Sequence, residues 1–122
     1  MKTLDTNAII YYLEAEDSVP VVRDALAGDE PVFISVITEL ELLSDPESTD
    51  AERNDILMIL ETVVVIPVES QIAHTAATLR REYKIKTPDS IIAATALFTN
   101  TDLITRNTKD FKNIKPLRVT EI

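Results

Sequence analysis

Short apolar runs alternate along the chain with longer segments whose apolar residues recur at helical spacing. The short runs have the length and composition of strands. We expect strands at residues 1–4, 32–34, 63–68 and 102–105, and a shorter one at 115–119. Because residues 63–68 are nearly all β-branched, we expect that run to be a central, buried strand.

The segments between these runs predict six helices, since their apolar residues form one-sided stripes. We expect them at residues 6–13, 18–28, 35–43, 49–60, 70–83 and 87–99. Ser18, Ser35 and Thr87 are the expected N-caps, and Gly28 is the expected stop of the second helix. Strands that alternate with helices predict an α/β domain with a mostly parallel sheet of four to five strands.

Length and composition indicate one globular domain that spans residues 1–122. The chain has no cysteine, which excludes disulfides, thiolate metal sites and thiol catalysis. One histidine, His74, rules out a two-histidine metal site, and one glycine rules out the glycine-rich nucleotide loops. No apolar run reaches the ~20 residues of a membrane span, and no signal-peptide pattern opens the chain, so we expect a cytoplasmic protein.

The net charge of −9 argues against nucleic-acid binding through a broad basic surface. It is compatible with an enzyme whose acids surround divalent cations. The one dense basic stretch contains Arg80, Arg81, Lys84 and Lys86. This stretch could bind phosphates of a nucleic acid, or it could be the solvated end of a helix.

Acidic residues follow the predicted strands at several equivalent places. Asp5 ends the first strand, Glu39 and Glu41 lie in the helix after the second, Asp89 lies in the first turn of a helix, and Asp110 follows the fourth strand. Ligands of open α/β sheets bind at the carboxyl ends of the strands, so these acids are candidates for one site. Each also has an ordinary structural interpretation: Asp5 as a helix cap, Asp89 as a partner of the helix dipole, and Asp110 as a surface acid.

Clustered carboxylates repel one another unless a cation lies between them. An all-oxygen site with few protein ligands suits Mg²⁺ or Mn²⁺. A metal held in this way can activate water and stabilise charge on a phosphate, so the pattern predicts hydrolysis of a phosphodiester.

Four short motifs resemble those of PIN-domain nucleases, in particular the VapC-type toxins of toxin–antitoxin pairs. They read L-D-T-N from Leu4, I-S-V-I-T-E-L-E-L-L-S from Ile34, P-D-S-I-I-A-A-T-A from Pro88, and L-I-T-R-N-T-K-D-F from Leu103. The resemblance covers essentially the whole chain. It implies a three-layer α/β/α domain and a Mg²⁺- or Mn²⁺-dependent ribonuclease. It also implies a homodimer that is inhibited by an antitoxin protein.

The resemblance assigns roles to residues of this chain. Asp5 and Asp89 would be the principal metal ligands, and Glu41 and Asp110 would bind directly or through water. In the family pattern the second acid stands three residues after a threonine; from Thr38 this gives Glu41, with Glu39 as the rival. Many relatives carry an acid where this chain has Asn107, which leaves Asn107 and Asp110 as alternatives at the fourth position. The expected supporting residues are Thr6, Asn7, Thr105 and Asn107, with Asn7 orienting Asp5 or accepting a bond from Thr6.

Two other functions are compatible with the sequence. An asparagine at position 107, where many relatives carry an acid, and the acidic net charge suggest a non-catalytic PIN-like module that binds RNA or protein. A carboxylate-metal phosphatase is the other alternative, but the chain lacks a D-x-D opening, since Asn7 stands at the second acid's place.

Overall fold

A five-stranded parallel sheet forms the centre of the computed structural model, which describes residues 1–15 and 19–122. Its order is β3-β2-β1-β4-β5, and every neighbouring pair is parallel. The strands are β1 (Lys2–Leu4), β2 (Val32–Ser35), β3 (Val64–Ile66), β4 (Asp102–Thr105) and β5 (Val119–Glu121). Because all strands run the same way, their carboxyl ends lie at one edge of the sheet, and the α/β prediction is confirmed.

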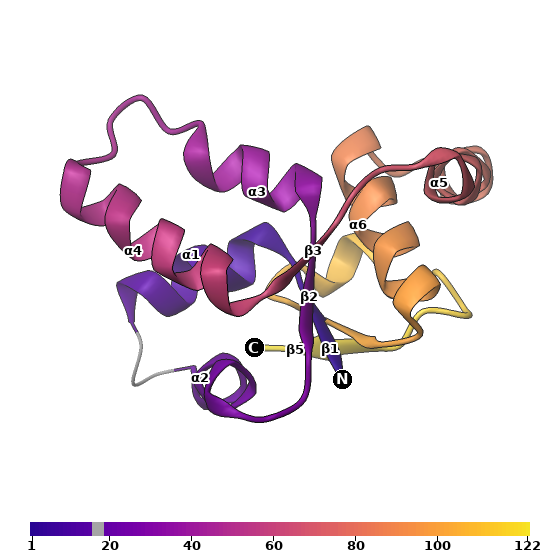
Figure 1. Cartoon of the computed structure of the whole chain (residues 1–122). Helices are drawn as coiled ribbons and strands as arrows, with labels where there is room; N and C mark the ends of the chain where they lie inside the picture. Colours follow the sequence, from indigo (N-terminus) through magenta and orange to yellow (C-terminus); the bar gives the residue numbers. More distant parts are fainter. Residues whose placement is uncertain (16–18) are drawn as a thin grey trace.

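Helices cover both faces of the sheet and complete three layers (Figure 1). One face carries α1 (Thr6–Glu14), α2 (Pro20–Ala27), α3 (Val36–Leu43) and α4 (Asp50–Thr62), and the other carries α5 (Ser70–Tyr83) and α6 (Thr87–Thr99). A short 3₁₀ turn, η2 (Thr108–Asp110), follows β4. None of the described helices is both long and apolar enough to cross a membrane.

The two faces of the sheet have separate apolar cores. Ile104 packs with the α1 to α4 side, whereas its neighbour Leu103 packs with the α5 and α6 side. This follows from the strand geometry, since successive side chains point to opposite faces. Both Leu103 and Ile104 are fully buried, so β4 is covered on both sides.

Most predicted helix starts are found at the expected residues. The Ser35 side chain accepts the Ile37 N–H, and Thr49 and Glu52 form a reciprocal capping box at the start of α4. Thr87 is not a cap: α6 begins at Thr87 itself, with Lys86 in the cap position and no side-chain cap bond. The predicted cap Ser18 lies outside the described residues, and Gly28 ends α2 as expected.

Two strand predictions are wrong in detail. The run from Val63 to Val68 contributes the three-residue β3 at an edge of the sheet rather than a central strand, and Val64 is 44% exposed. β2 is the only strand that pairs with β3 in the described part of the chain, and the β-branched residues of β3 pack against this neighbour and the helices. The last strand is β5 at Val119–Glu121, later than the expected 115–119, because β5 pairs with β4 from Val119 onward.

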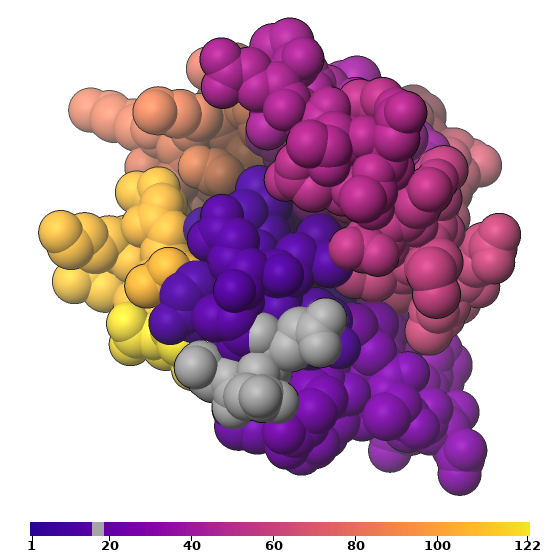
Figure 2. Space-filling model, turned by 90° about the vertical axis from the view of Figure 1, so that its left-hand side faces the viewer, coloured from indigo at the N-terminus to yellow at the C-terminus, as the bar shows by residue number. Residues whose placement is uncertain are grey.

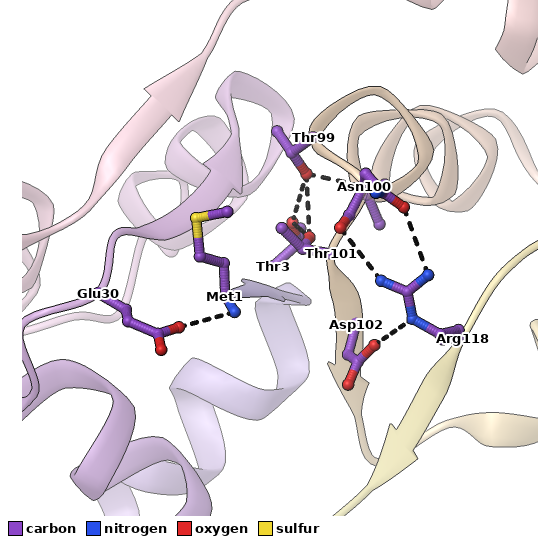
Figure 3. A network of polar contacts seen from close by, with 9 residues as sticks. Met1, Thr3, Glu30, Thr99, Asn100, Thr101, Asp102 and Arg118 are labelled. Carbon is purple, nitrogen blue, oxygen red and sulfur yellow. Dashed lines mark hydrogen bonds and ion pairs between the residues drawn. The ribbon is translucent and has the colours of Figure 1, made fainter.

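A cluster of hydroxyl groups fixes the start of β1 (Figure 3). The Oγ1 atoms of Thr3 and Thr101 are 2.6 Å apart, and Thr99 joins both of them. Nearby, the Arg118 guanidinium donates to the Asp102 carboxylate at 2.6 Å and to the Asn100 carbonyl at 3.1 Å, which ties the chain before β5 to the start of β4. The position of β1 between β2 and β4 is therefore set by side chains as well as by the ladder.

Candidate active site at the carboxyl edge of the sheet

Asp5 lies at the end of β1 and is only 4% exposed. Its Oδ1 accepts the Thr6 N–H at 2.7 Å, and its Oδ2 accepts the Thr105 hydroxyl at 2.8 Å. Asp5 is also the N-cap of α1, so the structural and the functional interpretation of this residue apply together. Two hydrogen bonds to two different oxygens fix the orientation of the carboxylate.

The Asp5 carboxyl has its pKa raised from 3.8 to about 6. The largest cause is burial, which penalises the charged form, and the negative charges of Asp89 and Glu41 add to it. The hydrogen bonds from Thr105 and Thr6 lower the pKa and oppose the shift only in part. At neutral pH, a carboxylate at this position carries a buried negative charge that the two hydrogen bonds compensate only in part.

Glu41 reaches this site from α3. Its Oε1 accepts the Thr6 hydroxyl at 2.6 Å, and the Thr38 hydroxyl lies 3.1 Å from the same Thr6 oxygen. The negative charge of Glu41 raises the pKa of both Asp5 and Asp89. Glu39 is half-buried in the first turn of the same helix. Of the two rival acids, the structure brings Glu41 into contact with the residues around Asp5.

Asp89 lies in the first turn of α6 and is half-buried. Its pKa is raised by burial first, then by the negative charges of Asp110 and Glu41, while the positive charge of Lys86 lowers it. The pKa of Asp89 thus depends on the charges of both Asp110 and Glu41, which are more exposed than Asp89. The four predicted acids form one electrostatically coupled group, although they come from four separate segments of the chain.

The loop after β4 connects the remaining predicted residues. The Thr105 hydroxyl oxygen lies 3.3 Å from the side-chain Oδ1 of Asn7, which also accepts the Arg106 backbone N–H at 3.1 Å. Thr105 in turn accepts the Asn107 N–H at 2.9 Å, and the Asn107 amide donates to the Asp110 carboxylate. Among the described residues, the Asn7 side chain thus bonds to the end of β4 and the loop after it rather than to Asp5 or Thr6, and Asn107 and Asp110 are partners rather than alternatives in space.

Two residues around the site were not among the predicted site residues, although Thr38 served as the reference point for Glu41. Thr38 is fully buried beside Thr6, and its spacing of three from Glu41 on a helix was the signal that could have suggested a shared face. Arg106 lies over the Tyr11 ring at 3.8 Å from the centroid, a cation–π contact that links the β4 loop to α1. This contact joins segments far apart in sequence, so no local pattern indicated it.

The donor set fits a divalent cation. All four side chains offer carboxylate oxygens, and the pKa of Asp5 and of Asp89 is raised first by burial and then by the negative charges of the neighbouring acids. Among the described residues, no three acidic or histidine side chains converge tightly enough to enclose a metal ion. Repulsion between the negative charges favours this separation, and a bound cation would remove the repulsion.

Comparisons with known proteins agree with the fold and with a match over most of the chain. A family model described as the PIN domain matches residues 2–116. Ribonuclease VapC10 of Mycobacterium tuberculosis is 30% identical over 126 residues, which cover 97% of this chain and 91% of that protein. A toxin–antitoxin complex from Klebsiella pneumoniae contains a chain that is 34% identical, with a TM-score of 0.83 and 100% of both chains covered. VapBC2 of Rickettsia felis, solved with a fragment of promoter DNA, is 25% identical with a TM-score of 0.85 and covers 99% of this chain and 98% of that chain.

Proposed function

Because the chain belongs to the PIN domain family, we propose that it is a metal-dependent ribonuclease and the toxin of a toxin–antitoxin pair. The observation that carries the proposal is the buried Asp5 carboxylate, coupled electrostatically to Asp89 and Glu41 at the carboxyl edge of the sheet. Residues 1–122 would act as one PIN-like domain in the cytoplasm, where prokaryotic RNA is found. Ribonuclease names among the relatives and toxin–antitoxin complexes among the similar structures support this assignment.

In this proposal Asp5 and Asp89 are the principal ligands of Mg²⁺ or Mn²⁺, and Glu41 and Asp110 bind directly or through water. When bound, such a cation supplies charge stabilisation for the phosphate and a more acidic water. The chain's own residues hold the ligands in position. The Thr6 and Thr105 hydroxyls each donate to one of these carboxylates, so the ligands are oriented before any substrate arrives.

The Asn107 amide and the Thr105 hydroxyl have a second role in the proposal. Thr105 is the last residue of β4 and Asn107 lies on the loop that follows, both at the same edge as Asp5. Asn107 turns the Asp110 carboxylate by hydrogen bonding, and its side chain remains half-buried. We assign to Asn107 the positioning of Asp110 or of the scissile phosphate, with hydrolysis of RNA as the reaction.

A groove between α1, α3 and α4 supports a protein partner. It has a volume of about 190 Å³, an apolar floor that includes Leu42 and Ile56, and an acidic rim that includes Glu41, Glu52 and Asp55. Figure 2 shows this face of the molecule, where α1 (indigo) and α4 (magenta) are both at the surface. The groove suits a basic, partly apolar segment of an antitoxin, which would then lie beside Glu41. Reversal of the rim charge with Asp55→Lys should weaken co-purification of the antitoxin.

The proposal includes a homodimer through α3, which flanks the acids. Leu40 and Leu43, one turn apart on this helix, are 61% and 41% exposed, so a second subunit could cover both side chains. Light scattering during size-exclusion chromatography should give twice the chain mass for the wild type and the chain mass for Leu40→Glu. Equal masses for the two proteins would contradict an α3 interface.

The deciding experiment compares wild type, Asp5→Asn and Asp89→Asn on total RNA with Mg²⁺, with Mn²⁺ or with EDTA. We expect cleavage by the wild type that depends on the cation and is lost in both variants. Asp29→Asn, the same chemical change at an exposed residue, is the matched control and should cleave as the wild type does.

The alternative function, a non-catalytic PIN-like module, makes the opposite prediction. It is motivated by the separation of the acids, since no three of them converge in the described part of the chain. RNA binding by the wild type without cation-dependent cleavage, and without an effect of Asp5→Asn, would favour the module. Release of phosphate from a small phosphomonoester without cleavage of RNA would instead favour a phosphatase.

A further inference from the structure

A second cleft opens beside the acids, where the end of α5, the start of α6 and the η2 turn meet. Its volume is about 400 Å³. The charged side chains that line it are Lys84, Lys86, Lys109, Glu82, Asp89 and Asp110. Asp89 and Asp110 belong to the proposed metal site, so the cleft and that site share one wall.

The local backbone explains how three lysines come to line one cleft. Lys84 ends α5 with a left-handed conformation (φ 57°), which turns the chain sharply between α5 and α6. Lys86 then caps α6, and its carbonyl accepts the Ser90 N–H at 2.9 Å. Lys109 comes from η2, more than twenty residues later, and lines the same cleft. The basic lining is therefore assembled by the fold and is not only a run of sequence.

The charge of the cleft depends on the acids at its end. With the charges of Asp89 and Asp110 balanced by a divalent cation, the lining retains three lysines against Glu82. The cleft would then carry a local excess of positive charge, although the net charge of the whole protein is −9. Lys86 already acts on the site, because its positive charge lowers the pKa of Asp89. A polyanion that reaches the acids through this cleft would meet cations along its path.

We propose that Lys86 and Lys109 bind phosphate groups of the RNA strand next to the scissile phosphodiester, so that this cleft is the path by which the strand approaches the acids. The inference rests on the proposed ribonuclease function and names the surface that holds the substrate. The contacts are to the phosphate backbone, so they position the strand without reading its sequence. The half-buried Tyr83 ring, packed against the core below, forms part of the apolar floor.

The test measures binding of fluorescein-labelled poly(U) by fluorescence anisotropy in Mg²⁺, as a function of salt. All proteins carry Asp5→Asn so that the probe is not cleaved. The test variant is Lys86→Ala/Lys109→Ala. The matched control is Lys112→Ala/Lys115→Ala, which removes the same charge from two exposed lysines that do not line the cleft. Lys86→Arg/Lys109→Arg keeps the charge in the cleft.

For single strands, the logarithm of the binding constant falls with log salt by about 0.7 for each phosphate contact. We expect the slope to decrease by about 1.4 in Lys86→Ala/Lys109→Ala, to stay unchanged in the control, and to be restored by the arginine pair. In the cleavage-competent background the alanine pair should raise KM for RNA with kcat nearly unchanged. Equal slopes for the alanine pair and the control would overturn the inference.

The outcomes separate this inference from the proposed function. If the wild type cleaves RNA and the slopes of the alanine pair and the control are equal, only the role of the cleft is refuted. If the wild type does not cleave but the slope falls in the alanine pair alone, the cleft binds phosphates and the ribonuclease assignment fails. If there is neither cleavage nor binding of poly(U), both are refuted.

Discussion

Replacement of Asp5 by asparagine should stabilise the metal-free protein while abolishing its activity. The Asp5 pKa lies at about 6 instead of 3.8, mainly because the carboxylate is buried. One pKa unit corresponds to about 1.36 kcal/mol. Ionised Asp5 therefore makes the folded protein about 3 kcal/mol less stable than an ionised acid with an unshifted pKa would. Asparagine keeps the acceptor for the Thr6 N–H and weakens the contact with Thr105, at a cost of about 1 kcal/mol.

The net gain for Asp5→Asn at pH 7.5 is therefore about 1–2 kcal/mol. In EDTA, this should appear as a Tm higher by about 3–8 °C in thermal unfolding followed by circular dichroism. The gain should disappear at pH 4. The folded wild type keeps its proton up to about pH 6, so its extra stability is complete below pH 3.8 and is lost as the pH rises through 6.

Magnesium should reverse the order of the two proteins. Saturation with a ligand at a hundred times its Kd stabilises by about 2.7 kcal/mol, and only the wild type retains all four carboxylates. Asp29→Asn should leave the Tm unchanged in both conditions. A lower Tm for Asp5→Asn than for the wild type in EDTA at pH 7.5 would refute the reasoning, because the carboxylate would then stabilise the fold.

Other predictions concern the groups around the site and the scaffold. Thr105→Val should lower the free energy of unfolding by about 1–3 kcal/mol in urea, since Asp5 and the Asn107 N–H each lose a partner, whereas Thr105→Ser should retain both bonds. At limiting Mg²⁺, cleavage should decline as the pH falls below about 6, because protons compete with the cation for Asp5; a profile that is flat down to pH 4 would contradict this. Thr49→Ala breaks the capping box with Glu52 and should cost about 1 kcal/mol of stability, measured by urea unfolding, without changing cleavage.

The sequence predicted the sheet and the helices because each element has a one-sided apolar pattern that is local. It could not predict the neighbours of a strand in the sheet. The run from Val63 to Val68 is as β-branched as a central strand, yet β3 has a neighbour on only one side. The same limit applies to the Thr3 hydroxyl cluster, whose other members, Thr99 and Thr101, lie almost a hundred residues away.

The candidate site was predicted as a set of residue types rather than as a geometry. Asp5 was predicted from its place at a strand end and Glu41 from the family pattern counted from Thr38; the structure connects the two through Thr6, which donates its N–H to Asp5 and its hydroxyl to Glu41. The bond between Asn107 and Asp110 was missed, because sequence reasoning treated them as rivals for one position. Roles in metal binding and catalysis remain predictions for the variants described above.

The bond between Thr105 and Asp5 spans a hundred residues, and this bears on when the nuclease becomes active during its own synthesis. β1 emerges from the ribosome first, but β4 and the loop with Asp110 emerge near the end, so the four carboxylates meet only after most of the chain has been translated. On the proposed function, a chain that is still being translated would lack part of this group of acids and would not cleave RNA. The separation in sequence would therefore delay toxicity until translation is nearly complete, and an antitoxin already present in the cell could bind each chain as its fold is completed.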